Sequence, residues 1–335
     1  MYNFKIEFSK FIAEFYNEQF SKLKSHERDK VIQTLGASRE ILNEFLASDD
    51  IYITLPHASM NIFFPRAGVS RYVYELQNIN KKAFHLRFFL THTNFSDLNW
   101  RPYAWWFINS GKIEKFTFFT RNKKKKHTIV HSLNPGEVNA AHSITPFRNE
   151  FEVSMTFQNI SLSFMFLTAF QEINSGFSHK GRTLYIPLDA YISFIIQKAK
   201  SDTMYFEVLN EFIRNADCRK IAGEELTSTH DWQEAFIFDN VTNISLLNFL
   251  RPTAFVGGAK MNNYWHQVVD KWNLSMQNNN GTDYIAPENI EIPFNSACLD
   301  MYGPSENIAS ELKKYNIPYS LTMAIQEHDL FINKS

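Results

Sequence analysis

Between residue 51 and about residue 170, the chain contains short segments rich in aromatic and β-branched residues, the composition typical of β-strands. These segments are residues 51–55, 71–76, 84–91, 103–109, 115–120, 127–133, 150–157 and 160–167. No long helical pattern separates consecutive segments, and polar turns such as "NSGK" and "NPGE" punctuate them. Parallel strands need long crossover connections, so this arrangement favours antiparallel pairing.

Helical patterns lie on both sides of this region. Residues 1–48 carry apolar side chains at helical spacing and predict a hairpin of two amphipathic helices, the second of which Gly36 weakens or splits. Four further helices are predicted at 187–200, 201–217, 261–276 and 304–315. The predicted fold class is therefore α+β, with a mostly antiparallel sheet core (about 51–186) and helices at both ends of the chain.

The change from helical to strand-like patterns and back divides the chain into three regions. They are an N-terminal helical hairpin (1–48), an antiparallel β-rich region (49–186) and a helix-rich C-terminal region (187–335). The last two regions are also compatible with one continuous domain, because 335 residues fit either one large domain or two of ordinary size.

The composition indicates a folded, soluble protein. The chain is 44% hydrophobic and 16% aromatic with a net charge of −1, whereas a disordered chain has few aromatics and a high net charge. Its two cysteines, Cys218 and Cys298, do not make a disulfide framework. No secretory signal and no apolar run of about 18 residues is found, so we expect a cytoplasmic protein with no membrane partner.

The strongest functional pattern is a basic tip in the stretch "TRNKKKKHT". Its charged residues are Arg121, Lys123, Lys124, Lys125, Lys126 and His127. Such a run repels itself and should project into water from the end of a hairpin, where lysines can contact a nucleic-acid backbone without reading its sequence. Arg101 and Trp105 lie just upstream and would add a charge and a stacking surface. The alternatives are a plain solvated turn and a site for an acidic protein.

No motif in the chain marks a catalytic, cofactor or metal site. The loop "GFSHKGRT" resembles a phosphate-binding loop, but Arg182 replaces the lysine and a strand is predicted where a helix is needed. His127 and His131 share a spacing that suits a metal, without a third ligand. His57, at the end of a predicted strand, is where we would first look for a catalytic group. The paired glycines of "FVGGAK" suit either a tight turn or a close approach to a phosphate.

From these observations, we predict a binding protein, a subunit of a larger assembly, that contacts nucleic acid through the basic tip. DNA and RNA are not distinguished. Two alternatives remain open: an enzyme, a nuclease or transferase whose site is assembled from residues distant in sequence, and a structural subunit that binds only proteins. We expect no cofactor and no metal, and the sequence identifies no catalytic residue.

Overall fold

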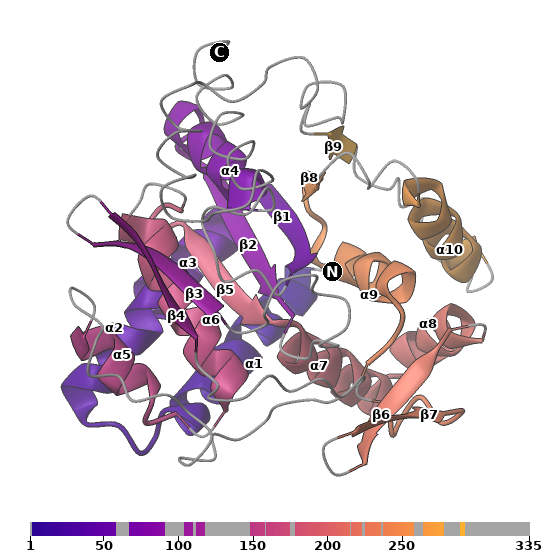
Figure 1. Ribbon diagram of the computed structural model, residues 1–335. Helices are drawn as coiled ribbons and strands as arrows, with labels where there is room; N and C mark the ends of the chain where they lie inside the picture. The colour runs from indigo at the N-terminus through magenta and orange to yellow at the C-terminus, as the bar shows by residue number, and fades with distance from the viewer. Residues whose placement is uncertain are drawn as a thin grey trace.

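The computed structural model describes residues 2–57, 67–90, 104–109, 112–117, 148–157, 159–174, 178–214, 216–222, 225–235, 237–257, 264–277 and 289–291 (Figure 1). The helices in this part of the chain are α1 (Tyr2–Gln19), α2 (Ser25–Thr34), α3 (Arg39–Ala47), α4 (Ala67–Ile79), α5 (Arg148–Ser154), α6 (Ile160–Asn174), α7 (Leu188–Ser201), α8 (Thr203–Ile213), α9 (Asn240–Leu247), the 3₁₀ turn η3 (Asn248–Leu250) and α10 (Trp265–Gln277). The strands are β1 (Asp50–His57), β2 (Ala83–Phe89), β3 (Ala104–Asn109), β4 (Lys112–Thr117), β5 (Thr183–Pro187), β6 (Cys218–Ala222), β7 (Glu225–Thr229), β8 (Ala254–Gly257) and β9 (Asn289–Glu291).

The main sheet is parallel. Its strands lie in the order β5-β2-β1-β8-β9, and every neighbouring pair runs in the same direction (Figure 1). Numbered along the chain, these five strands have the order 3-2-1-4-5, which is the order of a doubly wound α/β sheet. Two separate antiparallel pairs, β3–β4 and β6–β7, are also present among the described residues.

The predicted antiparallel core is therefore wrong. Three of the segments taken for strands are helical: 71–76 lies in α4, 150–154 forms most of α5, and 160–167 lies in α6. α4 is the crossover between β1 and β2 that parallel pairing requires. Its segment "RYVYEL" imitates a strand because aromatic and β-branched residues also serve to pack a short helix.

Several other predicted elements are confirmed. Residues 51–55 and 84–89 lie in β1 and β2, and β3 and β4 pair as an antiparallel hairpin on either side of the "NSGK" turn. Helices occur as α7, α8 and α10, and Asp202 caps α8 by accepting a hydrogen bond from the Met204 amide at 2.9 Å. The second predicted N-terminal helix is split at Gly36 into α2 and α3, one of the two outcomes expected from the sequence. The predicted strand at 127–133 and the predicted helix at 304–315 lie outside the described residues.

The sheet has two chemically different faces. Residues at matched positions of adjacent parallel strands point to the same side, and side chains alternate along each strand. One set, here called the polar face, contains Tyr52, Thr54, His85, Arg87, Thr183 and Tyr185. The other set, here called the apolar face, contains Ile51, Ile53, Phe84, Leu86, Phe88, Leu184, Ile186 and Phe255. All seven residues of β2 are buried, so both faces are covered by other elements.

Different helices cover the two faces. Phe45 of α3 contacts Phe84, Tyr191 of α7 contacts Phe88, and Trp265 of α10 contacts Phe255, so these three helices pack on the apolar face. α6 reaches the polar face through Glu172. The crossovers β1-α4-β2 and β2-α6-β5 progress in the same direction and, with the usual right-handed connection, place α4 on the polar face beside α6.

The outer edge of β5 is covered by the N-terminal helices. The Tyr185 amide donates to the Leu35 carbonyl at 2.9 Å, and the Tyr185 carbonyl accepts from the Tyr16 hydroxyl at 2.6 Å. Gly36 ends α2 with φ +79°, and a Cβ atom there would overlap the Thr183 carbonyl oxygen. Glycine is therefore required at this position for two independent reasons, its positive φ and the close approach of two backbones.

The apolar core is continuous across the three predicted regions. One cluster of buried side chains runs from Phe4 in α1, through Leu86 in β2, to Trp272 in α10. The predicted boundaries between the regions stay a prediction.

Candidate functional site

Most of the residues predicted to contact nucleic acid lie outside the described part of the chain. These are Arg101, Arg121, Lys123, Lys124, Lys125, Lys126 and His127. Trp105 lies in β3 and is paired in register with Phe116 of β4. The first strand of the hairpin predicted to carry the basic tip overlaps β4, and its second strand, 127–133, lies outside the described residues, so the nucleic-acid interface stays a prediction.

The strand order brings two sequence-distant strand ends together. β1 connects to β2 on one side and lies next to β8 on the other, so the direction of winding reverses between β1 and β8. His57 ends β1 and Gly257 ends β8. In open parallel sheets, ligands bind outside the carboxyl ends of the strands at such a reversal. Two features singled out in the sequence, His57 and the first of the paired glycines, therefore flank the expected binding position.

Just inside this edge, the polar face carries a buried ion pair. Arg87 of β2 and Glu172 of α6 lie 3.4 Å apart, and the side chain of each is only 2% exposed. The Tyr185 hydroxyl donates to the other Glu172 oxygen at 2.8 Å, and Arg87 also donates to the Phe88 carbonyl at 3.0 Å. Burial raises the pKa of Tyr185 well above its ordinary value, and the nearby charge of Glu172 raises it further. The phenol therefore stays protonated and remains a donor.

A buried histidine lies on the same face. Nε2 of His85 is 3.0 Å from the hydroxyl of Thr54 in the neighbouring strand, and His85 is completely buried. Burial lowers its pKa well below the ordinary 6.5, and the positive charge of Arg87 lowers it further. The imidazole is therefore neutral at physiological pH. This group of buried polar side chains is called the polar layer below. It comprises Thr54, His85, Arg87, Thr183 and Tyr185 of the sheet, Ser70 and Gln77 of α4, and Thr168 and Glu172 of α6.

The polar layer contains buried polar atoms that make no hydrogen bond. They are Ser70 Oγ, Gln77 Oε1, His85 Nδ1, Arg87 Nε, Thr168 Oγ1 and Thr183 Oγ1. Native structures leave few buried polar groups unsatisfied, and a group of them in one layer calls for an ordered water or a ligand. No sequence motif predicted this site, although His85 and Arg87 alternate with apolar residues in "FHLRFF", a pattern that indicates one polar face.

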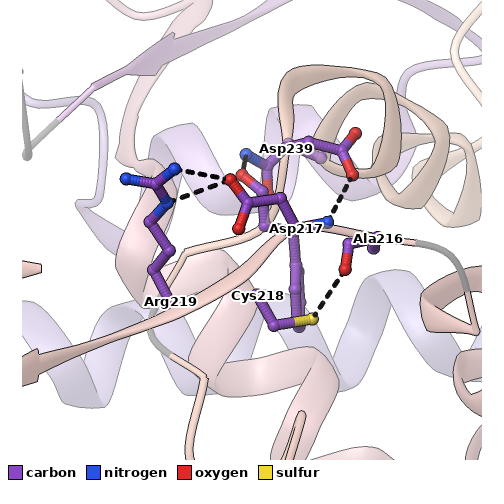
Figure 2. A network of polar contacts seen from close by, with 7 residues as sticks. Ala216, Asp217, Cys218, Arg219 and Asp239 are labelled. Atoms are coloured by element: carbon purple, nitrogen blue, oxygen red, sulfur yellow. Dashed lines mark hydrogen bonds and ion pairs between the residues drawn. The ribbon is translucent and has the colours of Figure 1, made fainter. Parts of the chain in front are cut away.

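A second polar network lies around Cys218 and is structural. Asp239 caps α9 by accepting from the amide and hydroxyl of Thr242 at 2.9 and 3.0 Å, and it also accepts from the Asp217 amide (Figure 2). Arg219 binds Asp217 through Nε and a terminal nitrogen at 3.0 and 2.7 Å. The network ties β6 to the start of α9.

Cys218 lacks the environment of a nucleophile. Figure 2 shows its sulfur directed toward the Ala216 carbonyl, at 3.7 Å. Burial and the charges of Asp239 and Asp217 raise the pKa of the thiol to about 11, so the thiolate is scarce at neutral pH. Cys218 is thus a small buried residue with a free thiol.

The phosphate-loop interpretation is excluded by the elements around it. The loop "GFSHKGRT" follows α6 and leads into strand β5, with no helix after it. Arg182 instead donates to the carbonyls of Gln77, Asn80 and Lys81, at 2.8, 3.4 and 3.2 Å. These carbonyls lie at and just beyond the end of α4, so Arg182 caps that helix.

An open groove of about 930 Å³ lies among the first three helices. Its floor includes Ala13, Ile32 and Leu42, and its rim includes Lys10 and Arg39. Lys30, also in its wall, is paired with Glu150 at 2.7 Å. The groove has neither the buried ionisable groups nor the position at the strand ends that distinguish the polar layer.

No group of three or more potential metal ligands (His, Cys, Asp or Glu) is found within the described residues. None of the described helices is both long and apolar enough to cross a membrane. Comparison with known protein families, with curated proteins and with solved structures gives no match to this chain. The case for a function therefore rests on the site itself.

Proposed function

We propose that the protein binds a phosphorylated small molecule, such as a nucleotide, at the carboxyl ends of β1 and β8. The observation that carries this proposal is the reversal of strand order between these two strands. Gly257 ends β8 and another glycine follows it, which favours a close approach of the backbone to a phosphate. His57 ends β1 at the same edge of the sheet.

The test is ligand binding to a variant with the glycine blocked. We expect inorganic phosphate, adenosine 5′-monophosphate (AMP) and ATP to raise the melting temperature of the wild-type protein, because a ligand that binds only the folded state stabilises it. Gly257→Val should abolish the shift. Gly181→Ala, at the amino end of β5 and thus at the opposite edge, should keep it. The proposal is wrong if no probe shifts the wild type, or if Gly257→Val responds as the wild type does.

The enzyme alternative gains support from the polar layer. Its ionisable residues come from β2, β5 and α6 and are distant in sequence, as that alternative requires. Buried titratable groups with shifted pKa values concentrate at functional sites. Cleavage of single-stranded nucleic acid with added Mg²⁺, compared between wild type and Glu172→Gln, tests the nuclease version. Equal cleavage by both proteins would exclude Glu172 as a participant.

The basic tip supports a second candidate function, contact with a nucleic-acid backbone. The supporting observation is strand β4, which ends at Thr117, four residues before Arg121. Replacing Lys123, Lys124, Lys125 and Lys126 with Ser should weaken retention on heparin, with a smaller dependence on salt. A retention profile unchanged by the substitution would remove this candidate. Other protein subunits as partners stay a prediction from the sequence.

A further inference from the structure

The polar layer lies just inside the carboxyl edge of the sheet, and its Thr54 belongs to β1, one of the two strands of the proposed site. Arg87 is two residues before the end of β2, which corresponds to about 7 Å along a strand. α6 leads into the start of β5 and therefore runs antiparallel to the strands. Thr168 is one turn before Glu172 on the same side of α6, and so about 6 Å nearer the carboxyl edge. Unpartnered polar atoms of β2 and α6 thus lie within one small ligand's length of the strand ends.

The charge balance of the layer selects the kind of group that it can accept. Arg87 and Glu172 cancel each other, and His85 and Tyr185 are neutral. Adding one more charge to a site this buried would leave it without a partner, at a cost of several kcal/mol. An uncharged group adds no such cost.

The unpartnered atoms also define the hydrogen bonds that are needed. Near the carboxyl edge of the sheet, Arg87 Nε can only donate, while the Ser70 and Thr168 hydroxyls can both donate and accept. Groups that present donors and acceptors side by side, such as sugar hydroxyls or the edge of a nucleobase, match this mixture. A phosphate or a carboxylate, which only accepts, does not.

We propose that the polar layer binds the uncharged, hydrogen-bonding half of the ligand, a ribose or a base, whose phosphate lies at the strand ends. The position of the phosphate in this proposal rests on the proposed function. The binding of the uncharged group by the polar layer does not. A bound ligand would also explain why Arg87 Nε is buried without a hydrogen-bond partner although the side chain already pairs with Glu172. In the absence of ligand, water can satisfy the same atoms.

The experiment measures binding of adenosine, D-ribose, AMP and inorganic phosphate by calorimetry to wild type and Thr168→Val. Valine has nearly the shape of threonine and removes one unpartnered buried hydroxyl, so the variant should melt at the same or a higher temperature. We expect its affinity for adenosine and AMP to fall at least fivefold and its affinity for phosphate to stay unchanged. Thr34→Val, on α2 and outside the layer, is the matched control and should bind as the wild type does.

Each outcome has a separate meaning. Binding of D-ribose as well as adenosine assigns the sugar to the layer, and binding of adenosine alone assigns the base. Adenosine binding that weakens in Thr168→Val, without any phosphate binding, supports the layer and overturns the proposed phosphate site. No adenosine or ribose binding to the wild type, or equal binding by Thr168→Val, overturns the layer proposal and leaves ordered water as its occupant.

A double variant guards against an effect on folding. Arg87→Met with Glu172→Leu replaces the ion pair with apolar side chains of similar size, an exchange that often keeps or raises stability. If this protein melts at or above the wild-type temperature but has lost adenosine binding, the pair serves a ligand. Retention of wild-type adenosine affinity by the double variant would overturn the proposal.

Discussion

The two faces of the parallel sheet are built from the same strands but follow different rules. On the apolar face, Phe84 contacts Phe45 of α3 and Phe88 contacts Tyr191 of α7, and Leu86 between them is fully buried. On the polar face, His85 and Arg87 occupy the intervening positions of the same strand. Within β2, the residues of both faces are buried. The comparison shows that a buried face is not always a stabilising core. The apolar face stabilises the fold by packing, whereas the polar face lowers the free energy of unfolding because some of its buried polar groups lack hydrogen bonds.

The largest expected effect breaks the apolar face. Phe88→Ala should lower the free energy of unfolding by about 3–5 kcal/mol, because it removes a buried ring and leaves a cavity beside Tyr191. Urea unfolding followed by circular dichroism measures this. A loss below about 1 kcal/mol would mean that α7 does not pack on the sheet as described.

The next effect concerns the ion pair of the polar face. Glu172→Leu alone should cost about 3 kcal/mol in unfolding free energy, because it leaves the Arg87 charge buried without a partner. Adding Arg87→Met should recover most of that loss. The apolar face offers no such recovery, since a second truncation there only enlarges the cavity. Equal stability of the single and double variants would show that the two residues are not coupled.

A pH dependence distinguishes the faces further. The pKa of His85 is lowered in the folded state, so below about pH 6.5 the unfolded chain binds a proton that the folded chain does not, and stability falls as pH falls. At pH 5.5 this amounts to about 1.4 kcal/mol. His85→Gln should remove that part of the slope in urea titrations at several pH values. His179, whose pKa is also lowered, remains in both proteins and cancels in the comparison.

The smallest effect provides a reference away from both faces. Asp239→Ala removes the cap of α9 and should cost about 1 kcal/mol in unfolding free energy. Because the cap touches neither face, its effect should add to that of Phe88→Ala and to that of Glu172→Leu within about 0.5 kcal/mol. If the changes in unfolding free energy, measured in the same urea assay, clearly fail to add, α9 is energetically coupled to the sheet.

Local patterns predicted several of the elements but not how the strands pair. β1, β2, the β3–β4 hairpin, α7, α8 and α10 follow from spacing, turns and caps, and each is observed. The direction of pairing depended on whether residues 71–76 and 160–167 were strands or helices, and short apolar runs do not decide that by periodicity. Once those two segments become helices, the chain alternates β and α, and a parallel sheet follows.

The candidate site was harder to predict for a different reason. His57 and the paired glycines attracted attention individually, but only the strand order brings His57 and Gly257 to one edge. Arg87 and Glu172 are 85 positions apart and belong to no motif. Their partnership depends on the tertiary placement of α6, which no local pattern encodes. The basic tip, by contrast, was visible in sequence and lies outside the described residues, so it stays a prediction.

The cover that the N-terminal helices form over the outer edge of β5 has a consequence for association between molecules. A strand with bare amide and carbonyl groups invites another chain to add to it. Here both outward groups of Tyr185 are already occupied by Tyr16 and Leu35. An arriving strand would first have to pull the N-terminal helices away. The first 48 residues thus block the addition of another strand at this edge of the sheet. A truncated chain that starts after them should form fibres or larger aggregates far more readily.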